Sequence, residues 1–149
     1  MDDVQAVERL TLALENFNSV FIRLPDSGRL SFSALSVLHT LSRVGSCRLS
    51  DLVRTEQIKQ PALTSAVAKL ADDGLMRREP DPLDGRAAVL SLTDAGQALV
   101  RERHTDRARR LGVLLERLSP EDRVQLLGVA EIFDRIVHLA DEPGEGPQL

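Results

Sequence analysis

Apolar residues recur along the N-terminal part of the chain at intervals of three and four, which places them on one face of a helix. The first such stripe ends before Pro25 and the DSGR sequence that follows it, which stop the helix. Ser31 can cap a second helix, and Gly45 ends it. The stripe residues are Val7, Leu10, Leu14, Phe17, Phe21 and Leu24, and then Leu35, Leu38 and Leu41. The pattern therefore predicts a long first helix within residues 1–25 and a shorter second helix.

The middle of the chain predicts two more helices and a β-hairpin. A short helix covers Leu49–Arg54, and Pro61 begins the next helix, where its missing N–H is harmless. DDG at residues 72–74 closes this helix, which has one apolar face and one small, polar and cationic face. The apolar face holds Leu63, Val67 and Leu70, and the other face holds Ala62, Thr64, Ser65, Ala66, Ala68 and Lys69. Two extended runs, LMRRE from Leu75 and AAVLSL from Ala87, are joined by PDPLDGR, which favours a hairpin.

The last third predicts two helices that have apolar stripes and little else to pack against. Thr93 can cap the first, and SPED at residues 119–122 begins the second with a cap and a proline. The stripes are Ala108, Leu111, Leu115 and Leu118, and then Leu126, Val129, Phe133 and Ile136. Because such helices bury their apolar faces against each other, we expect a homodimer. The tail at residues 141–149 cannot bury anything and is expected to be disordered.

The composition favours a single domain in the cytoplasm. The chain has 149 residues, 42% of them hydrophobic, which is enough for one ordinary core. No apolar run approaches the ~20 residues of a membrane helix, and the acidic N-terminus differs from a signal peptide. Cys47 is the only cysteine, and His39, His104 and His138 have no metal-ligand spacing. We therefore expect no membrane association, no metal and no cofactor.

The net charge of −4 is distributed unevenly. The segment from Arg48 to Arg110 has twelve basic and ten acidic residues, whereas the segment from Leu111 to Leu149 has three and eight. A relatively basic middle and an acidic end can orient a protein on DNA, although an excess of two charges is weak evidence by itself. The arginines of RERHTDRARR, residues 101–110, fit a solvated helix face better than a second DNA site.

Two helices joined by a tight turn and followed by a basic hairpin form the pattern of a winged helix-turn-helix. In this geometry the second helix enters the major groove, and the hairpin reaches phosphates or the minor groove. The segment from Leu49 to Leu99 resembles the MarR family of bacterial transcription regulators, and the flanking helices are similar to that family's dimerisation arms. The most specific match is the wing, because DPLDGR followed by SLTDAG is similar to the family's D-x-x-D-x-R and L-T-x-x-G. The expected fold is mainly α with a small β-hairpin.

The resemblance implies a dimerisation helix in residues 1–25, a winged helix-turn-helix region in 31–93, and linker and dimerisation helices in 94–140. It implies a transcription regulator, in the leading interpretation a ligand-responsive repressor, that binds a pseudo-palindromic operator in double-stranded DNA as a homodimer. The residues expected to contact DNA are Lys59, Gln60, Pro61, Ala62, Thr64, Ser65, Lys69, Arg77, Arg78, Asp84 and Arg86. Arg86 would lie at the wing tip, and Asp84 would orient it. The residues expected at the dimer interface are Leu10, Leu14, Phe17, Leu111, Leu115, Leu126, Phe133 and Ile136.

An effector is also implied by the resemblance. It would be a phenolic or other amphipathic aromatic molecule, bound between the DNA-binding lobe and the helical arms. The candidate lining residues are Phe17, Phe21, Leu38, Leu41 and His104, of which the apolar ones are equally good core candidates.

The turn before the recognition helix departs from the family's pattern. Gln57 stands where glycine is common, Glu56 stands where an apolar residue is common, and Lys59 replaces the usual small hydroxyl cap. A missing cap costs about 1 kcal/mol of helix stability. The lysine that replaces the cap would instead be able to contact a DNA phosphate.

Other kinds of function compete with the DNA-binding regulator. The alternative is a protein-interaction module that keeps the winged fold and binds a partner through its acidic C-terminal helix. Salt dependence separates the two, because binding through several phosphates weakens steeply as salt rises. Cys47 is either a redox sensor or a passive thiol, and the passive role is favoured. An enzyme is disfavoured, since the sequence has no supported catalytic triad, phosphate loop or carboxylate pair.

Overall fold

The computed structural model describes residues 3–24, 28, 30–55 and 58–141. Three predictions lie outside the described residues: the turn at Pro25 and the residues after it, the turn at Glu56 and Gln57, and the tail from residue 142. The chain forms two compact units, residues 1–108 and residues 109–149.

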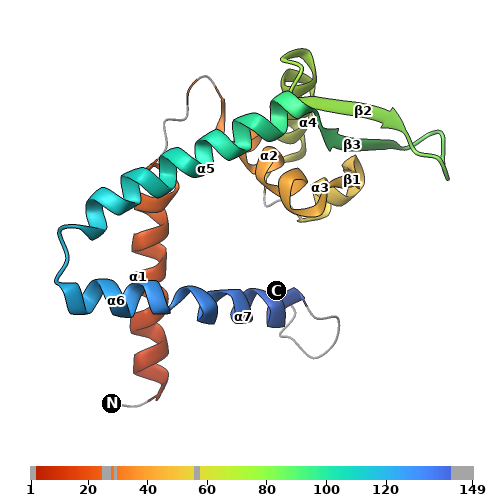
Figure 1. Cartoon of the computed structure of the whole chain (residues 1–149). Helices are drawn as coiled ribbons and strands as arrows, with labels where there is room; N and C mark the ends of the chain where they lie inside the picture. Colours follow the sequence, from red (N-terminus) through yellow and green to blue (C-terminus); the bar gives the residue numbers. More distant parts are fainter. Residues whose placement is uncertain (1–2, 25–27, 29, 56–57, 142–149) are drawn as a thin grey trace. The chain divides into compact units, whose positions relative to one another are not determined.

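The first unit contains the predicted helices and a small sheet (Figure 1). Its elements are α1 (Asp3–Phe21), α2 (Phe32–Val44), β1 (Ser46–Arg48), α3 (Leu49–Thr55), α4 (Gln60–Asp72), β2 (Met76–Pro80), β3 (Ala88–Leu92) and the first part of α5 (Asp94–Leu115). The second unit contains the end of α5, α6 (Pro120–Gly128) and α7 (Ala130–Asp141). The fold class predicted from the sequence, mainly α with a small β element, is confirmed.

Local signals set the ends of these helices as the sequence predicts. The Ser31 hydroxyl accepts a hydrogen bond from the backbone N–H of Ala34 at the start of α2, and Gly45 ends that helix with a positive φ. Gly74, with φ of 71°, ends α4. The N–H of Gly74 donates to the Ala71 carbonyl and the N–H of Leu75 donates to the Leu70 carbonyl, which is the Schellman pattern.

The β element is a three-stranded sheet, larger than the hairpin that the sequence predicts. β2 and β3 form the predicted antiparallel hairpin, and β1 adds to the other edge of β3 in the order β1-β3-β2. The sequence did not indicate β1 because three residues are too few to show alternation. In the register, Arg48 of β1 lies opposite Val89, which lies opposite Glu79 of β2.

The core of the first unit lies between α2, α3, α4 and the sheet. Leu63, Val67 and Leu70 are buried, as predicted for α4. The placement of Ala66 on the polar face of α4 was wrong: it is 5% exposed, because the position before Val67 shares the apolar face. The buried apolar side chains are Ala34, Val37, Leu38, Leu41, Leu52, Leu63, Ala66, Val67, Leu70, Met76, Leu90 and Leu92.

The C-terminal stripe lies on two helices, where the sequence predicts one. The Ser119 hydroxyl caps α6 as expected, accepting from the N–H of Asp122. At Val129 the backbone N–H bonds to the carbonyl of Leu126, three residues back, and a new helix begins at Ala130. Gly128, a poor helix former, stands directly before the break.

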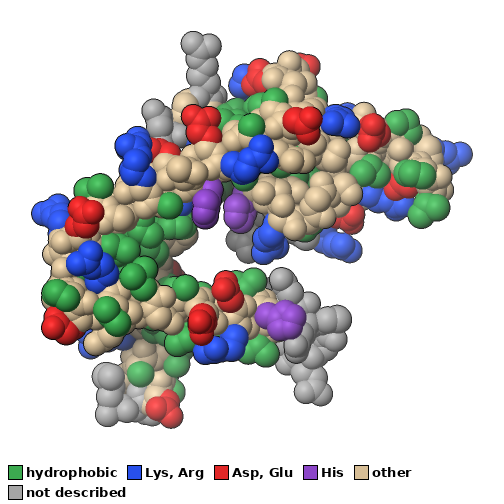
Figure 2. All heavy atoms as spheres, viewed as in Figure 1, with side chains coloured by type: hydrophobic (Ala, Val, Ile, Leu, Met, Phe, Trp, Pro, Cys, Tyr) green, Lys and Arg blue, Asp and Glu red, His purple; other side chains and the backbone are tan. Residues whose placement is uncertain are grey.

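The apolar stripes of the terminal helices are exposed in the single chain. None of the described residues of α1 or α6 is buried, and Leu10, Phe17 and Ile136 are 54%, 44% and 52% exposed. Exposed apolar side chains are visible on the second unit in Figure 2. None of the described helices is both long enough and apolar enough to cross a membrane.

Candidate nucleic-acid interface

α4 presents an exposed face that is small and polar. The residues predicted to contact DNA from this region are all exposed: Lys59, Gln60, Pro61, Ala62, Thr64, Ser65 and Lys69. The opposite face is anchored in the core through Leu63, Val67 and Leu70. Because Ala62, Thr64 and Ser65 on the exposed face are small, the backbone of this part of α4 can approach a groove closely.

Lys59, which precedes α4, and Lys69, which lies within it, have different surroundings. Lys59 occupies the cap position, and its side chain makes no capping hydrogen bond, as the departure from the family pattern predicts. Lys69 forms an ion pair with Asp73, with its Nζ 3.2 Å from Oδ2. Lys69 must therefore exchange this partner for a phosphate if it contacts DNA, whereas the charge of Lys59 has no such competitor among the described ion pairs.

Lys59→Ser is expected to stabilise the fold and weaken DNA binding at the same time. The serine hydroxyl would accept a hydrogen bond from an unpaired N–H in the first turn of α4, which is worth about 1 kcal/mol. The lost cation would reduce the salt dependence of DNA affinity by about one charge. Urea unfolding and DNA binding at several salt concentrations measure the two effects. Lys59→Ala, which removes the charge without adding a cap, should reproduce only the loss of affinity.

The wing tip is held by backbone hydrogen bonds to Asp84. Its Oδ1 accepts from the N–H of Arg86 at 3.1 Å, and its carbonyl accepts from the N–H of Ala87 at 2.8 Å. Asp84 thus holds the backbone of Arg86, and its role in orienting the arginine side chain toward DNA stays a prediction. Arg86 itself is exposed, and basic side chains lie at the wing tip on the face shown in Figure 2.

Arg77 and Arg78 are both exposed on β2, but the structure does not bring them to one surface. Successive side chains on a strand point to opposite faces of the sheet. Arg77 lies opposite Ser91 and Arg78 lies opposite the buried Leu90. Arg77 and Arg78 therefore project from opposite faces of the β2–β3 hairpin.

Arg48 and Asp81 form a pair that was not predicted from the sequence. Asp81 is the buried charged residue of the described chain, with 6% of its surface exposed. Its Oδ2 accepts from Nε of Arg48 at 2.5 Å, and its Oδ1 accepts from the N–H of Leu83 at 2.7 Å. The Leu83 hydrogen bond and, after it, the Arg48 guanidinium hold the pKa of Asp81 below its ordinary value, against the opposing effect of burial. Asp81 is the first Asp of the D-x-x-D-x-R motif, and its place in this motif was the one feature of the sequence that could have indicated a structural role for it.

The contribution of Asp81 to stability is expected to disappear in acid. Its pKa is lower in the folded chain than the unfolded value of about 3.9. A lowered folded pKa stabilises the fold above the unfolded pKa, and this stabilisation is lost as the pH falls through the folded pKa. Urea midpoints of the parent and Asp81→Asn should therefore differ most near neutral pH and converge below pH ~4. A difference that stayed constant down to pH ~3 would contradict the ionised role of Asp81.

The L-T-x-x-G sequence joins α5 to the turn after α4. The Thr93 hydroxyl donates to the Gly74 carbonyl at 2.7 Å and accepts from the N–H of Gly96 at 3.1 Å, which confirms the predicted cap. The N–H of Thr93 donates to the Leu75 carbonyl. Gly96 is buried, and a Cβ built on it would collide with that same carbonyl oxygen. These contacts fix the start of α5 on the winged domain.

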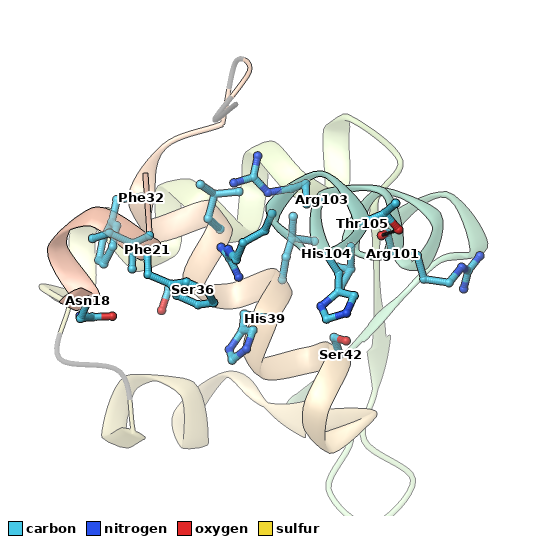
Figure 3. A pocket seen from close by; sticks show the side chains of 15 residues that line it. Asn18, Phe21, Phe32, Ser36, His39, Ser42, Arg101, Arg103, His104 and Thr105 are labelled. Carbon is cyan, nitrogen blue, oxygen red and sulfur yellow. Dashed lines mark hydrogen bonds between the residues drawn. The ribbon is translucent and has the colours of Figure 1, made fainter. Parts of the chain in front are cut away.

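A cavity of about 800 Å³ lies within the first unit, between α1, α2 and α5 (Figure 3). Of the predicted effector residues, Phe21, Leu38 and His104 line it. Phe17 does not line the cavity but stacks on Phe21 with ring centroids 5.5 Å apart, and Leu41 lies in the core. The lining residues are Asn18, Phe21, Ile22, Phe32, Leu35, Ser36, Leu38, His39, Ser42, Val100, Arg101, Arg103, His104, Thr105 and Arg107.

The cavity is basic on the side formed by α5. Arg101, Arg103 and Arg107 all line it, so this part of the arginine cluster is not purely a solvated helix face. The Arg107 guanidinium lies 4.9 Å from the centre of the Phe21 ring, and its buried Nε has no hydrogen-bond partner in the described structure. Burial and then the charge of Arg103 lower the pKa of Arg107. None of the described lining residues is acidic, so the cavity suits an anion.

Cys47 lies half-buried on β1, opposite Leu90, and packs against the core. Among the residues that the structure describes, no three His, Cys, Asp or Glu side chains gather in a way that could hold a metal ion.

A two-helix unit with a small polar face on its second helix, followed by a hairpin wing on the same core, defines a winged helix-turn-helix DNA-binding protein. The comparisons with known proteins give the particular family. The model of the MarR family matches residues 30–88. The chain is 30% identical over 135 residues to the HTH-type transcriptional regulator Mb0904 of Mycobacterium bovis, covering 91% of this chain and 94% of that protein. The protein belongs to the MarR family and is a transcription regulator.

Solved structures share the fold. Wild-type MarR from Escherichia coli in its apo form matches with a TM-score of 0.70 at 20% identity, covering 85% of this chain and 95% of that chain. BpsR of Bordetella bronchiseptica matches with a TM-score of 0.57 at 23% identity, covering 96% and 98%. The DNA binding of BpsR is regulated by 6-hydroxynicotinic acid. At these identities, the similarity supports the fold alone.

Proposed function

We propose that the protein is a ligand-responsive repressor that binds a pseudo-palindromic operator as a homodimer in the bacterial cytoplasm. The observation that carries the proposal is the exposed polar face of α4 on the same core as the wing that presents Arg86. In this arrangement α4 enters the major groove and reads base edges, and Arg86 enters the adjacent minor groove. The remaining predicted contacts position the protein on phosphates.

The proposed homodimer is supported by the uncovered apolar faces of α1, α6 and α7. Contiguous apolar surface that is left exposed marks sites of protein–protein interaction, whereas single exposed apolar residues are ordinary. A twofold axis would place two α4 helices about 34 Å apart, in successive major grooves on one side of the duplex. The operator would then be a pseudo-palindrome, because the two half-sites face symmetric subunits.

Ile136→Glu is expected to dissociate the dimer. Ile136 is 52% exposed in the single chain and lies on the apolar stripe of α7. Burying an unpaired carboxylate at the interface would weaken association by several kcal/mol, which corresponds to about a hundredfold or more in dimer affinity. Sedimentation velocity over a range of concentrations measures the change. Gln125→Glu adds the same charge at an exposed polar position of α6 and should leave the dimer intact.

The proposed effector is an amphipathic aromatic anion in the cavity of the first unit. The apolar side from α1 and α2 suits an aromatic ring, and the basic side from α5, with the unpaired Nε of Arg107, suits a phenolate or carboxylate. The effector releases DNA only if it binds the DNA-incompatible state more tightly than the DNA-bound state. Titrating hydroxybenzoic and hydroxynicotinic acids into the protein–operator complex tests this step.

Selection from randomised duplex DNA tests the function as a whole. The proposal predicts that sequencing the bound pool reveals an enriched pseudo-palindrome and that affinity falls steeply as salt rises. The alternative is an interaction module that uses its acidic C-terminal helix on a protein partner. A bound pool without a motif, together with weak salt dependence, would favour that alternative over operator binding.

A further inference from the structure

The loop that carries Arg86 is fixed at its base by an ion pair between the buried carboxylate of Asp81 and an arginine of a distant strand. Arg48 lies on β1, and Asp81 lies 33 residues later, directly after β2. Because β3 separates the two strands, the Arg48 side chain reaches past the central strand to meet the carboxylate. The Arg48 side chain is 41% exposed and the Asp81 side chain is 6% exposed, so solvent reaches the arginine but hardly reaches the carboxylate.

The Asp81 carboxylate links this pair to the wing tip. Its Oδ1 accepts from the N–H of Leu83, and the backbone N–H of Asp81 donates to the carbonyl of Ala87 at 3.0 Å. Asp84 then holds Arg86 and Ala87 from inside the loop. Residues 81–87 thus form one hydrogen-bonded turn, from which Leu83 projects with 91% of its surface exposed.

Arg48 links the same carboxylate to the helix that supports α4. The backbone N–H of Arg48 donates to Oδ2 of Asp51, in the first turn of α3, at 3.3 Å. One residue therefore contacts both the wing turn and the start of the helix-turn-helix. Pre-ordering a binding loop lowers the entropy lost on binding, and a fixed spacing lets two elements engage one ligand together.

We propose that Arg48 is a positioning residue for DNA binding, which orients the wing through Asp81 so that Arg86 and α4 engage the same duplex together. This inference rests on the proposed operator binding. It assigns Arg48 no direct contact with DNA. Loss of the ion pair would leave the carboxylate buried without its cationic partner and release the base of the wing.

A double-mutant cycle on operator affinity tests the proposal. Arg48→Gln is expected to weaken binding about tenfold, and Arg86→Ala is expected to cost no more than about twofold in that background, because a released wing no longer places Arg86. Arg54→Gln is the matched control. It removes an exposed arginine of α3 that bonds to Asp51 and leaves the Asp81 pair intact, so its effect should simply multiply with that of Arg86→Ala.

Footprinting gives a readout that general destabilisation would not produce. In Arg48→Gln the minor-groove protection by the wing should be lost, while the major-groove protection by α4 should remain. Thermal unfolding of each variant checks the fold. Asp81→Asn, which keeps an acceptor for the Leu83 N–H, repeats the cycle from the other partner and replaces Arg48→Gln if that variant does not fold.

These experiments distinguish failure of the positioning role of Arg48 from failure of the proposed operator binding. If the parent binds its operator and the effects of Arg48→Gln and Arg86→Ala multiply with the wing footprint intact, the positioning role is refuted and operator binding stands. If the parent selects no operator at all, both inferences fail.

Discussion

Arg86→Ala is expected to weaken binding to the selected operator by about tenfold to a hundredfold, the usual cost of one specific arginine contact. The side chain is exposed at the tip of a turn whose backbone is already held by Asp84. Gly85 and Ala87 on either side are small, so Arg86 can enter a narrow and electronegative minor groove. Fluorescence anisotropy with a labelled operator measures the loss, and the slope of log affinity against log salt should fall by about one.

The control for this prediction is the removal of an equal charge elsewhere. Arg117 is an exposed arginine of the second unit that belongs to none of the predicted contact sets. Arg117→Ala should change operator affinity only slightly, through the weak effect of net charge. Neither variant should move the thermal unfolding midpoint appreciably, since both side chains are exposed. Equal losses of affinity in the two variants would show that Arg86 acts only through net charge.

The helices and their ends could be predicted because their signals are local. Ser31, Thr93 and Ser119 each cap the helix that follows, and Gly74 ends α4 with a left-handed backbone, as the sequence indicates. Caps and stripes depend on residues within one or two turns, so a single sequence contains them. The break at Val129 was not predicted, because the apolar stripe continues across it and gives no indication of the changed backbone hydrogen bonds.

The parts that could not be predicted depend on residues far apart in the chain. The Arg48–Asp81 pair joins positions 33 residues apart. Asp81 belongs to the wing motif, but nothing in the sequence marks Arg48 as its partner. The cavity combines α1 and α2 with α5, so no local pattern distinguishes its arginines from those of a solvated helix face. Leu35 and Leu41 share one predicted stripe, yet Leu35 lines the cavity and Leu41 lies in the core. Tertiary packing decides which residues of one helical stripe line the cavity and which lie in the core.

Gly96→Ala is expected to destabilise the first unit by about 2–4 kcal/mol, because the added methyl group has no room. Its position would overlap the backbone carbonyl of Leu75, which cannot rotate away as a side chain would. That same carbonyl accepts the N–H of Thr93, so a shift that relieves the collision also strains the cap of α5. The thermal unfolding midpoint should fall by about 5–15 °C.

Gly112→Ala separates this collision from the general effect of replacing a helical glycine. Gly112 lies on the same helix, and the space where its Cβ would stand is open. Alanine there should raise stability by about 0.5–1 kcal/mol, because it has the higher helix propensity. The two substitutions are chemically identical and should have opposite signs, so their difference measures the close approach of α5 to Leu75. If Gly96→Ala were neutral or stabilising, α5 would start farther from the winged domain, and the L-T-x-x-G sequence would need an explanation other than packing.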